Sequence, residues 1–184
     1  SFFYTALAYY ASFIFSLCIH EASHSVAAYI LGDKQQLDDA RISLNPLRHF
    51  PSAADIFRPS RVMPVEVRVN RLMLPYLSYP IVKLAGPLIN FIIFIVCIYF
   101  AEHHAILNIV AVSNFFIMAS NLAPILCLDG GFFYVWILGV EKMTQMEGAS
   151  SDNIIKNRGF GAKFYSLWVL VVWLCSFSLI SSFR

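Results

Sequence analysis

A His-Glu-x-x-His motif inside a long apolar run constrains this chain more than any other feature. His20, Glu21 and His24 form the motif, and the stretch from Phe2 to Leu31 contains no other charged side chain. At 3.6 residues per turn, the two histidines lie one above the other on one helix face. Such a pair can bind one zinc ion, and Glu21 can contact a water on the metal. The motif therefore predicts a zinc site within a membrane, where ionisable groups are costly and usually functional.

The composition indicates an integral membrane protein. Of the 184 residues, 59% are hydrophobic and 13% are charged, whereas soluble globular chains have roughly 45–50% and about 25%. The length suits a single domain over residues 1–184. A net charge of +2 is too small to indicate nucleic acid. We therefore expect the lipid bilayer as a partner and no nucleic acid.

Four segments are apolar and long enough to cross a bilayer. They lie at about 2–31, 81–101, 105–122 and 164–182. The intervening polar segment 33–71 contains two stretches of alternating apolar and polar residues, Arg41–Leu44 and Val65–Val69. Because alternation with a period of two is typical of strands, we expect two short strands there. The expected fold class is an all-α polytopic membrane protein with a small β element near the mouth of the active site.

The distribution of basic residues predicts which side of the membrane the site faces. If the chain enters from outside, the segments 33–71 and 129–163 lie on one inner side, with seven and four of the thirteen basic residues. Cytoplasmic segments carry an excess of Lys and Arg. We therefore expect a multi-pass protein whose metal site faces the cytoplasmic-type side.

A catalytic zinc normally has three protein ligands and one water, so one ligand beyond the two histidines is needed. The candidates are Asp129, His49, His103, His104, the remaining carboxylates and Cys127. The topology above puts His103 and His104 on the opposite side, and His49 lies in the polar segment. Asp129 is the carboxylate in an apolar stretch broken by Pro and Gly on the correct side, so we assign it as the third ligand. A helix N-cap is an alternative role for Asp129, compatible with the first.

The chemistry expected of such a site is hydrolysis of a peptide bond inside the membrane. Zinc lowers the pKa of a bound water to about 7 and polarises a carbonyl. Glu21, which is not a ligand, would accept the proton of the water and deliver it to the leaving amine. The main alternative is a non-catalytic membrane scaffold stabilised by zinc, with four protein ligands. A di-iron oxidase needs more than the five histidines present, and no inverted repeat indicates a transporter.

Several motifs, in order along residues 15 to 135, resemble those of the site-2 protease family of intramembrane zinc metalloproteases. The resemblance is to its compact bacterial-type branch, which has no PDZ or CBS domains. The matching stretches are His20-Glu21-x-x-His24; Arg41-Ile42-Ser43-Leu44-Asn45-Pro46-Leu47-x-His49; Ala85-Gly86-Pro87-x-x-Asn90; Asn121-x-x-Pro124; and Leu128-Asp129-Gly130-Gly131.

The resemblance implies a core of three transmembrane helices and a zinc ion on His20, His24 and Asp129. It implies regulated intramembrane proteolysis, in which another protease first trims the transmembrane substrate, and a membrane of the bacterial inner-membrane type. By the same likeness, Asn121 and Asn90 would contact the substrate near the scissile carbonyl. For both residues, an ordinary hydrogen bond between helices is the alternative.

Overall fold

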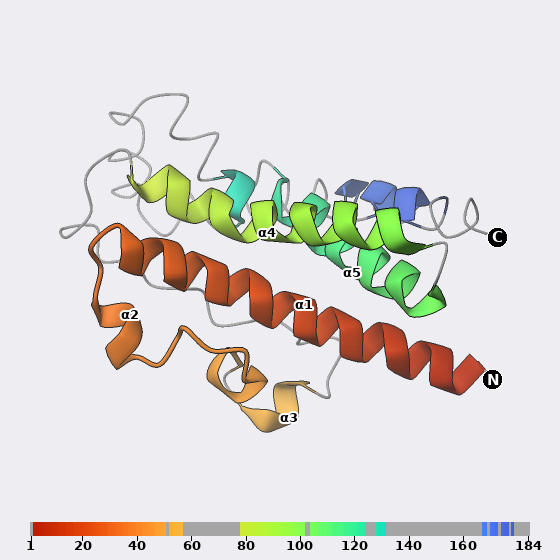
Figure 1. Ribbon diagram of the computed structural model, residues 1–184, viewed down its shortest axis with the longest axis horizontal. Helices are drawn as coiled ribbons and strands as arrows, with labels where there is room; N and C mark the ends of the chain where they lie inside the picture. Colours follow the sequence, from red (N-terminus) through yellow and green to blue (C-terminus); the bar gives the residue numbers. More distant parts are fainter. Residues whose placement is uncertain are drawn as a thin grey trace.

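The computed structural model is mostly helical in the part of the chain that it describes. That part comprises residues 2–50, 52–56, 78–101, 104–123, 128–131 and, apart from 169, 173 and 177, residues 167–178. Three long helices dominate it: α1 (Phe2–Ile30), α4 (Ser78–Phe100) and α5 (Ala105–Asn121) (Figure 1). The shorter elements are α2 (Gln35–Asp38), the 3₁₀ helix η1 (Pro46–Arg48) and α3 (Ala53–Ile56).

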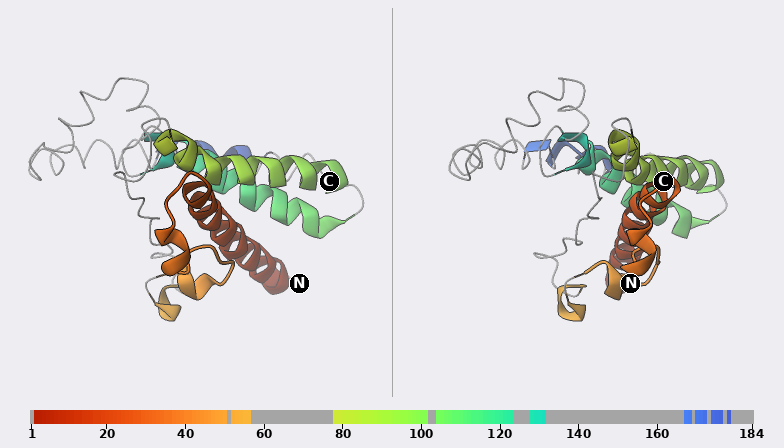
Figure 2. Two further views of the ribbon diagram at one scale, coloured as in Figure 1. Left: turned by 60° about the vertical axis from the view of Figure 1, so that its left-hand side comes forward. Right: turned by 90° about the vertical axis from the view of Figure 1, so that its left-hand side faces the viewer.

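The three long helices pack on one another. Each of α1, α4 and α5 contacts the other two, and α1 crosses α4 at an angle (Figure 2). The short connection between α4 and α5 makes them antiparallel neighbours, as short helix connections do. The C-terminal half of α1, the first half of α4 and the end of α5 consequently lie at the same end of the molecule (Figure 1).

Two of the helices are long and apolar enough to cross a membrane. They are Phe3–Ile30, with 28 residues and a mean hydropathy of 1.3, and Ser78–Phe100, with 23 residues and a mean hydropathy of 2.4. α5 is apolar but shorter, with 17 residues. The bounds of α1, α4 and α5 lie within three residues of the first three predicted spans. The number of membrane crossings stays a prediction.

α1 ends at Ile30, one residue before the end of the predicted span, and Gly32 follows in the turn after it. Gly32 has a φ of 118°, a conformation that side chains with a Cβ rarely adopt. It allows two backbone bonds to close the last turn: Gly32 N–H donates to the Tyr29 carbonyl at 3.1 Å, and Asp33 N–H donates to the Ala28 carbonyl at 2.9 Å. These bonds satisfy carbonyl groups that a helix end otherwise leaves unpaired.

The predicted β element is not found in the described residues, and at Arg41–Leu44 the prediction of a strand is wrong. This segment is irregular. The Ser43 carbonyl accepts a hydrogen bond from His49 Nε2 at 2.6 Å, and the Ser43 hydroxyl accepts one from Asn45 N–H at 3.1 Å. Such local side-chain bonds compete with strand pairing for the same backbone groups. The second predicted strand, Val65–Val69, lies outside the described residues.

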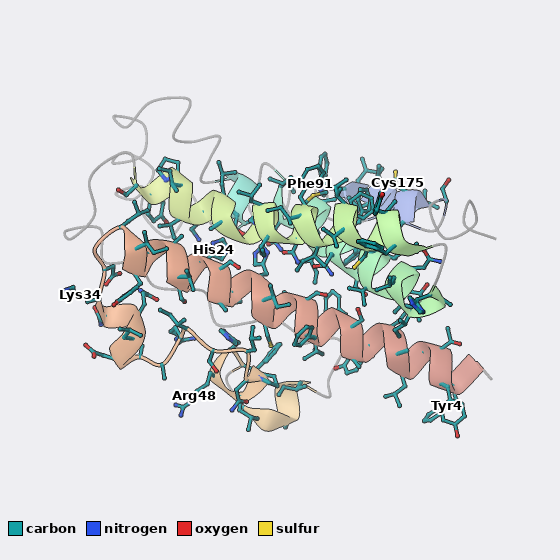
Figure 3. The ribbon with its side chains drawn as sticks, viewed as in Figure 1. Tyr4, His24, Lys34, Arg48, Phe91 and Cys175 are labelled. Carbon is teal, nitrogen blue, oxygen red and sulfur yellow. The ribbon has the colours of Figure 1, made fainter. Side chains whose placement is uncertain are left out.

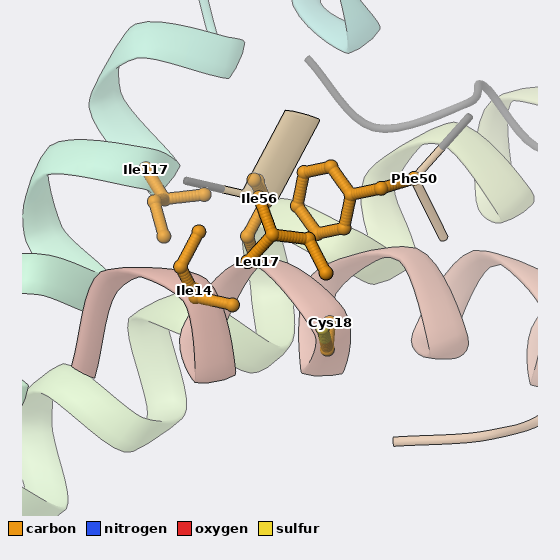
Figure 4. Close-up of a cluster of buried hydrophobic side chains, with 6 residues drawn as sticks. All are labelled: Ile14, Leu17, Cys18, Phe50, Ile56 and Ile117. Carbon is orange, nitrogen blue, oxygen red and sulfur yellow. The ribbon is translucent and has the colours of Figure 1, made fainter. Parts of the chain in front are cut away.

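After α2, the chain folds back along α1. Phe50 and Ile56 are buried against Leu17 and the neighbouring α1 side chains (Figure 4), and the Tyr10 hydroxyl donates to the Ile56 carbonyl. In the described part of the chain, the buried cluster comprises Ile14, Leu17, Cys18, Phe50, Ile56 and Ile117. This packing fixes the α2–α3 segment on the side of α1 away from α4 (Figure 1).

Candidate metal centre

The structure brings together the three residues that the sequence analysis assigns as metal ligands. His20 and His24 lie on α1 with their imidazoles against Gly86 of α4, and Figure 3 shows His24 on the side of α1 that faces α4. Asp129 starts a short helical turn after α5. Their ligand atoms all lie within 4.8 Å of one another, and all three residues are buried. Asp129 Oδ2 is 3.0 Å from His20 Nε2 and 3.1 Å from His24 Nε2. The two Nε2 atoms are 3.1 Å apart.

The outer nitrogen of each imidazole faces an acceptor. His20 Nδ1 lies 2.6 Å from Asn90 Oδ1, and His24 Nδ1 lies 2.7 Å from the Val82 carbonyl oxygen. Because an amide or carbonyl oxygen only accepts hydrogen bonds, each Nδ1 is the protonated donor. In the neutral imidazoles both Nε2 atoms then carry lone pairs, which is the tautomer that binds a metal through Nε2.

The donor set fits a zinc ion. Two Nε2 lone pairs and a carboxylate oxygen point to one place, where they repel one another unless a cation lies between them. Ligand atoms about 2.0–2.1 Å from a tetrahedral zinc are about 3.3–3.4 Å apart, close to the 3.0–3.1 Å found here. Two imidazoles and one carboxylate are also the ligand set of many catalytic zinc sites.

Gly86 on α4 allows the two imidazoles to lie against the helix backbone. A Cβ at this position would lie 2.7 Å from both Cε1 and Nε2 of His20, and closer still to His24 Nε2. Pro87 follows and lacks the N–H that would bind the Lys83 carbonyl within α4. The motif Ala85-Gly86-Pro87 therefore has a steric role at the site.

A second glycine fixes the approach of Asp129. A Cβ on Gly130 would lie 2.7 Å from the Ala123 carbonyl oxygen and closer to the Leu122 backbone, so the turn that carries Asp129 packs directly on the end of α5.

Glu21, adjacent to His20 on α1, is buried, with 7% of its surface exposed. The predicted general base thus lies in the same buried region as the ligands.

Asn90 is part of a buried polar network that joins all three long helices. Its side chain has 0% exposure. Its Oδ1 faces His20, and its Nδ2 donates to Asn114 Oδ1 at 2.7 Å and, at 3.4 Å, to the Ser16 carbonyl. Asn114 Nδ2 in turn donates to Ser16 Oγ at 2.9 Å. The Asn90 side chain therefore bonds within the protein and orients the His20 imidazole; its contact with substrate stays a prediction.

Replacing Asn90 with Leu should weaken zinc binding about 10- to 100-fold, as is typical when an outer partner of a metal ligand is lost. Without the Oδ1 acceptor, nothing on α4 holds the His20 imidazole in the tautomer that presents the Nε2 lone pair. Chelator competition on the purified protein measures the affinity. The control is Asn108→Leu on α5, whose Oδ1 makes no hydrogen bond. An affinity loss no larger than that of Asn108→Leu would contradict the orienting role.

Among the described residues, the group whose ligand atoms converge contains none of the other predicted candidates. Asn121, partly exposed in the last turn of α5, donates through Nδ2 to the Ile117 carbonyl at 3.0 Å; its contact with substrate stays a prediction. His104 is exposed just before α5. His103 and Cys127 lie outside the described residues.

His49 is buried next to Phe50, and its Nε2 donates to the Ser43 carbonyl at 2.6 Å. Burial lowers the pKa of the His49 imidazole below its ordinary value, the bond to Ser43 partly restores it, and nearby Arg41 lowers it again. Through its bond to the Ser43 carbonyl, the neutral His49 imidazole stabilises the segment after α2 that folds back along α1.

Two polar residues of the site were not recognised in the sequence. Asn114 lies in the apolar stretch of α5 without any motif around it, so no signal pointed to it. Lys83 is the second residue: its Nζ lies 3.4 Å from Asp129 Oδ1, and its side chain is 6% exposed. Its position one turn before Gly86 on the same helix is the signal that could have identified it.

Fold and site together define a helical protein with a buried His–His–Asp site that suits a metal ion. Over 86 residues the chain is 33% identical to a Bacillus subtilis (strain 168) protein named "Putative zinc metalloprotease YwhC". The match covers 44% of this chain and 38% of the relative, so it spans little more than a third of that protein. No family model matches the chain, and no solved structure is significantly similar to it.

Proposed function

We propose that this protein is a zinc endopeptidase of the site-2 protease family that hydrolyses peptide bonds within transmembrane segments. The observation that carries the proposal is the convergence of two Nε2 atoms and one carboxylate oxygen at 3.0–3.1 Å, at a place where both imidazoles present lone pairs. The similarity to a protein named "Putative zinc metalloprotease" supports the coarser part of the proposal, zinc-dependent peptide hydrolysis.

In this proposal His20, His24 and Asp129 hold the metal and Glu21 moves the proton. Bound zinc supplies Lewis acidity toward water and toward the peptide carbonyl. The Glu21 carboxylate accepts one proton from the attacking water while the oxygen of that water adds to the carbonyl carbon. The same proton then passes to the leaving nitrogen as the C–N bond breaks, so Glu21 is unchanged at the end. Asn121, at the end of α5, is the proposed contact for the substrate backbone.

The distribution of polar and apolar groups supports a membrane setting. Ser16, Asn90 and Asn114 are buried between the helices, whereas the outward side chains of α4 are apolar; Phe91, for example, lies on the side away from α1 (Figure 3). Polar interiors with apolar surfaces are typical of helices packed in lipid. We propose a multi-pass protein with its site toward the cytoplasmic-type face, acting on transmembrane substrates that another protease has trimmed.

Metal analysis of the purified protein tests the proposal. Wild type loaded with zinc should contain about one ion per chain. His24→Ala and Asp129→Ala should each lose it, while His104→Ala, which removes an exposed histidine, should keep it. A folded wild-type protein that takes up no zinc would refute the proposal. Four protein ligands in the X-ray absorption spectrum would instead favour a structural zinc in a non-catalytic scaffold.

A further inference from the structure

We propose that Lys83 is a positioning residue that restricts Asp129 to a single ligand oxygen. The inference rests on the proposed metal site. The two oxygens of the Asp129 carboxylate have different partners: Oδ2 lies 3.0 and 3.1 Å from the Nε2 atoms of His20 and His24, whereas Oδ1 lies 3.4 Å from Lys83 Nζ. The side chains of Lys83 and Asp129 are only 6% and 9% exposed.

The inward position of Lys83 calls for a physical reason. A lysine near the end of a membrane span ordinarily extends its ammonium toward the headgroups, where it stays hydrated. Here the ammonium is buried, and burying a charge pair costs about as much as the attraction between the charges returns. A gain in stability therefore does not explain the arrangement, whereas its effect on the carboxylate does.

The effect concerns how many positions around the metal the protein fills. A carboxylate can bind a metal through one oxygen or through both. An ammonium on Oδ1 competes with the metal for that oxygen, so Asp129 offers Oδ2 alone. With one position from each of His20, His24 and Asp129, the fourth tetrahedral position stays available for water or substrate, as a catalytic site requires. Without Lys83, Oδ1 is released to bind as well.

Cobalt substitution tests this directly, because the visible absorption of Co²⁺ is intense in four-coordinate sites and weaker in five-coordinate ones. Wild type, Lys83→Met, Lys83→Arg and the control Lys34→Met, which changes an exposed lysine, are loaded with Co²⁺ in detergent. We expect intense absorption in wild type, Lys83→Arg and Lys34→Met. In Lys83→Met the intensity should fall while the cobalt content is unchanged, and zinc X-ray absorption should show a gain of one oxygen ligand. Lys83→Leu, which likewise has no donor for Oδ1, should behave like Lys83→Met, and replaces it if that variant does not fold.

The outcomes separate this inference from the proposed function. A Lys83→Met or Lys83→Leu spectrum identical to that of wild type would overturn the role of Lys83 and leave the metal site intact, since the pair would then only join the helices. A five-coordinate wild type would overturn it as well, as would a Lys83 variant that loses the metal altogether. A wild type that binds neither cobalt nor zinc would overturn both.

Discussion

Replacing Glu21 with Gln should leave zinc bound and lower the rate of cleavage of a transmembrane substrate by about 10²–10⁴-fold, the usual contribution of a general acid or base. Gln has nearly the shape of Glu, so the packing of this buried position on α1 is preserved. An amide cannot accept the proton of the attacking water, and the three proposed ligands are unchanged. Zinc content by elemental analysis and cleavage of a transmembrane peptide in liposomes measure the two effects separately.

The matched control for Glu21 is Asp38→Asn, which makes the same change from carboxylate to amide at an exposed position of α2. It should retain both zinc and activity. Full activity of Glu21→Gln would refute the assigned role of the carboxylate. If the variant instead loses its zinc, Glu21 is a ligand and the geometry of the centre has been assigned incorrectly.

The local features of this site could be predicted from the sequence because they depend on short-range geometry. The spacing of His20 and His24 places them on one face of any helix, and Gly32 after an apolar run marks a helix end. The third ligand needed a different kind of argument. Asp129 lies 105 residues from His24, and the two are connected by the apolar, glycine-rich surroundings of Asp129, the expected topology and the family resemblance.

The features of the site that could not be predicted from the sequence depend on contacts between helices. Asn90 and Asn114 are single amides in apolar helices, and nothing local indicates that they bond to each other. Which way Lys83 turns depends on where the Asp129 carboxylate lies, which is a property of the fold. The alternation at Arg41–Leu44 predicted a strand, but the pattern covers only four residues, and the His49 imidazole takes the Ser43 carbonyl. A short pattern is overridden by one strong tertiary bond.

Replacing Gly86 with Ala should displace the two imidazoles and weaken zinc binding more than the loss of Asn90 does, by at least about 100-fold, because it acts on the ligands themselves. The added Cβ would lie 2.7 Å from His20 Cε1 and Nε2 and closer to His24 Nε2. The imidazoles cannot simply turn aside, since their Nδ1 atoms are bonded to Asn90 and Val82. Either α4 moves outward or these bonds break, and in both cases the Nε2 atoms no longer converge.

The melting temperature of Gly86→Ala, with and without zinc, separates the loss of zinc binding from general destabilisation of the fold. Within a helix Ala is favoured over Gly by up to about 1 kcal/mol, whereas overpacking costs about 1–3 kcal/mol. Gly86→Ala should therefore unfold at a temperature close to that of the metal-free wild type, yet fail to gain stability when zinc is added, since a ligand that no longer binds the native state cannot stabilise it. Ala85→Ser, which adds one atom at the neighbouring, partly exposed position, should keep the zinc-dependent rise in melting temperature. A Gly86→Ala protein with the same rise would show that the imidazoles do not lie against the backbone of α4.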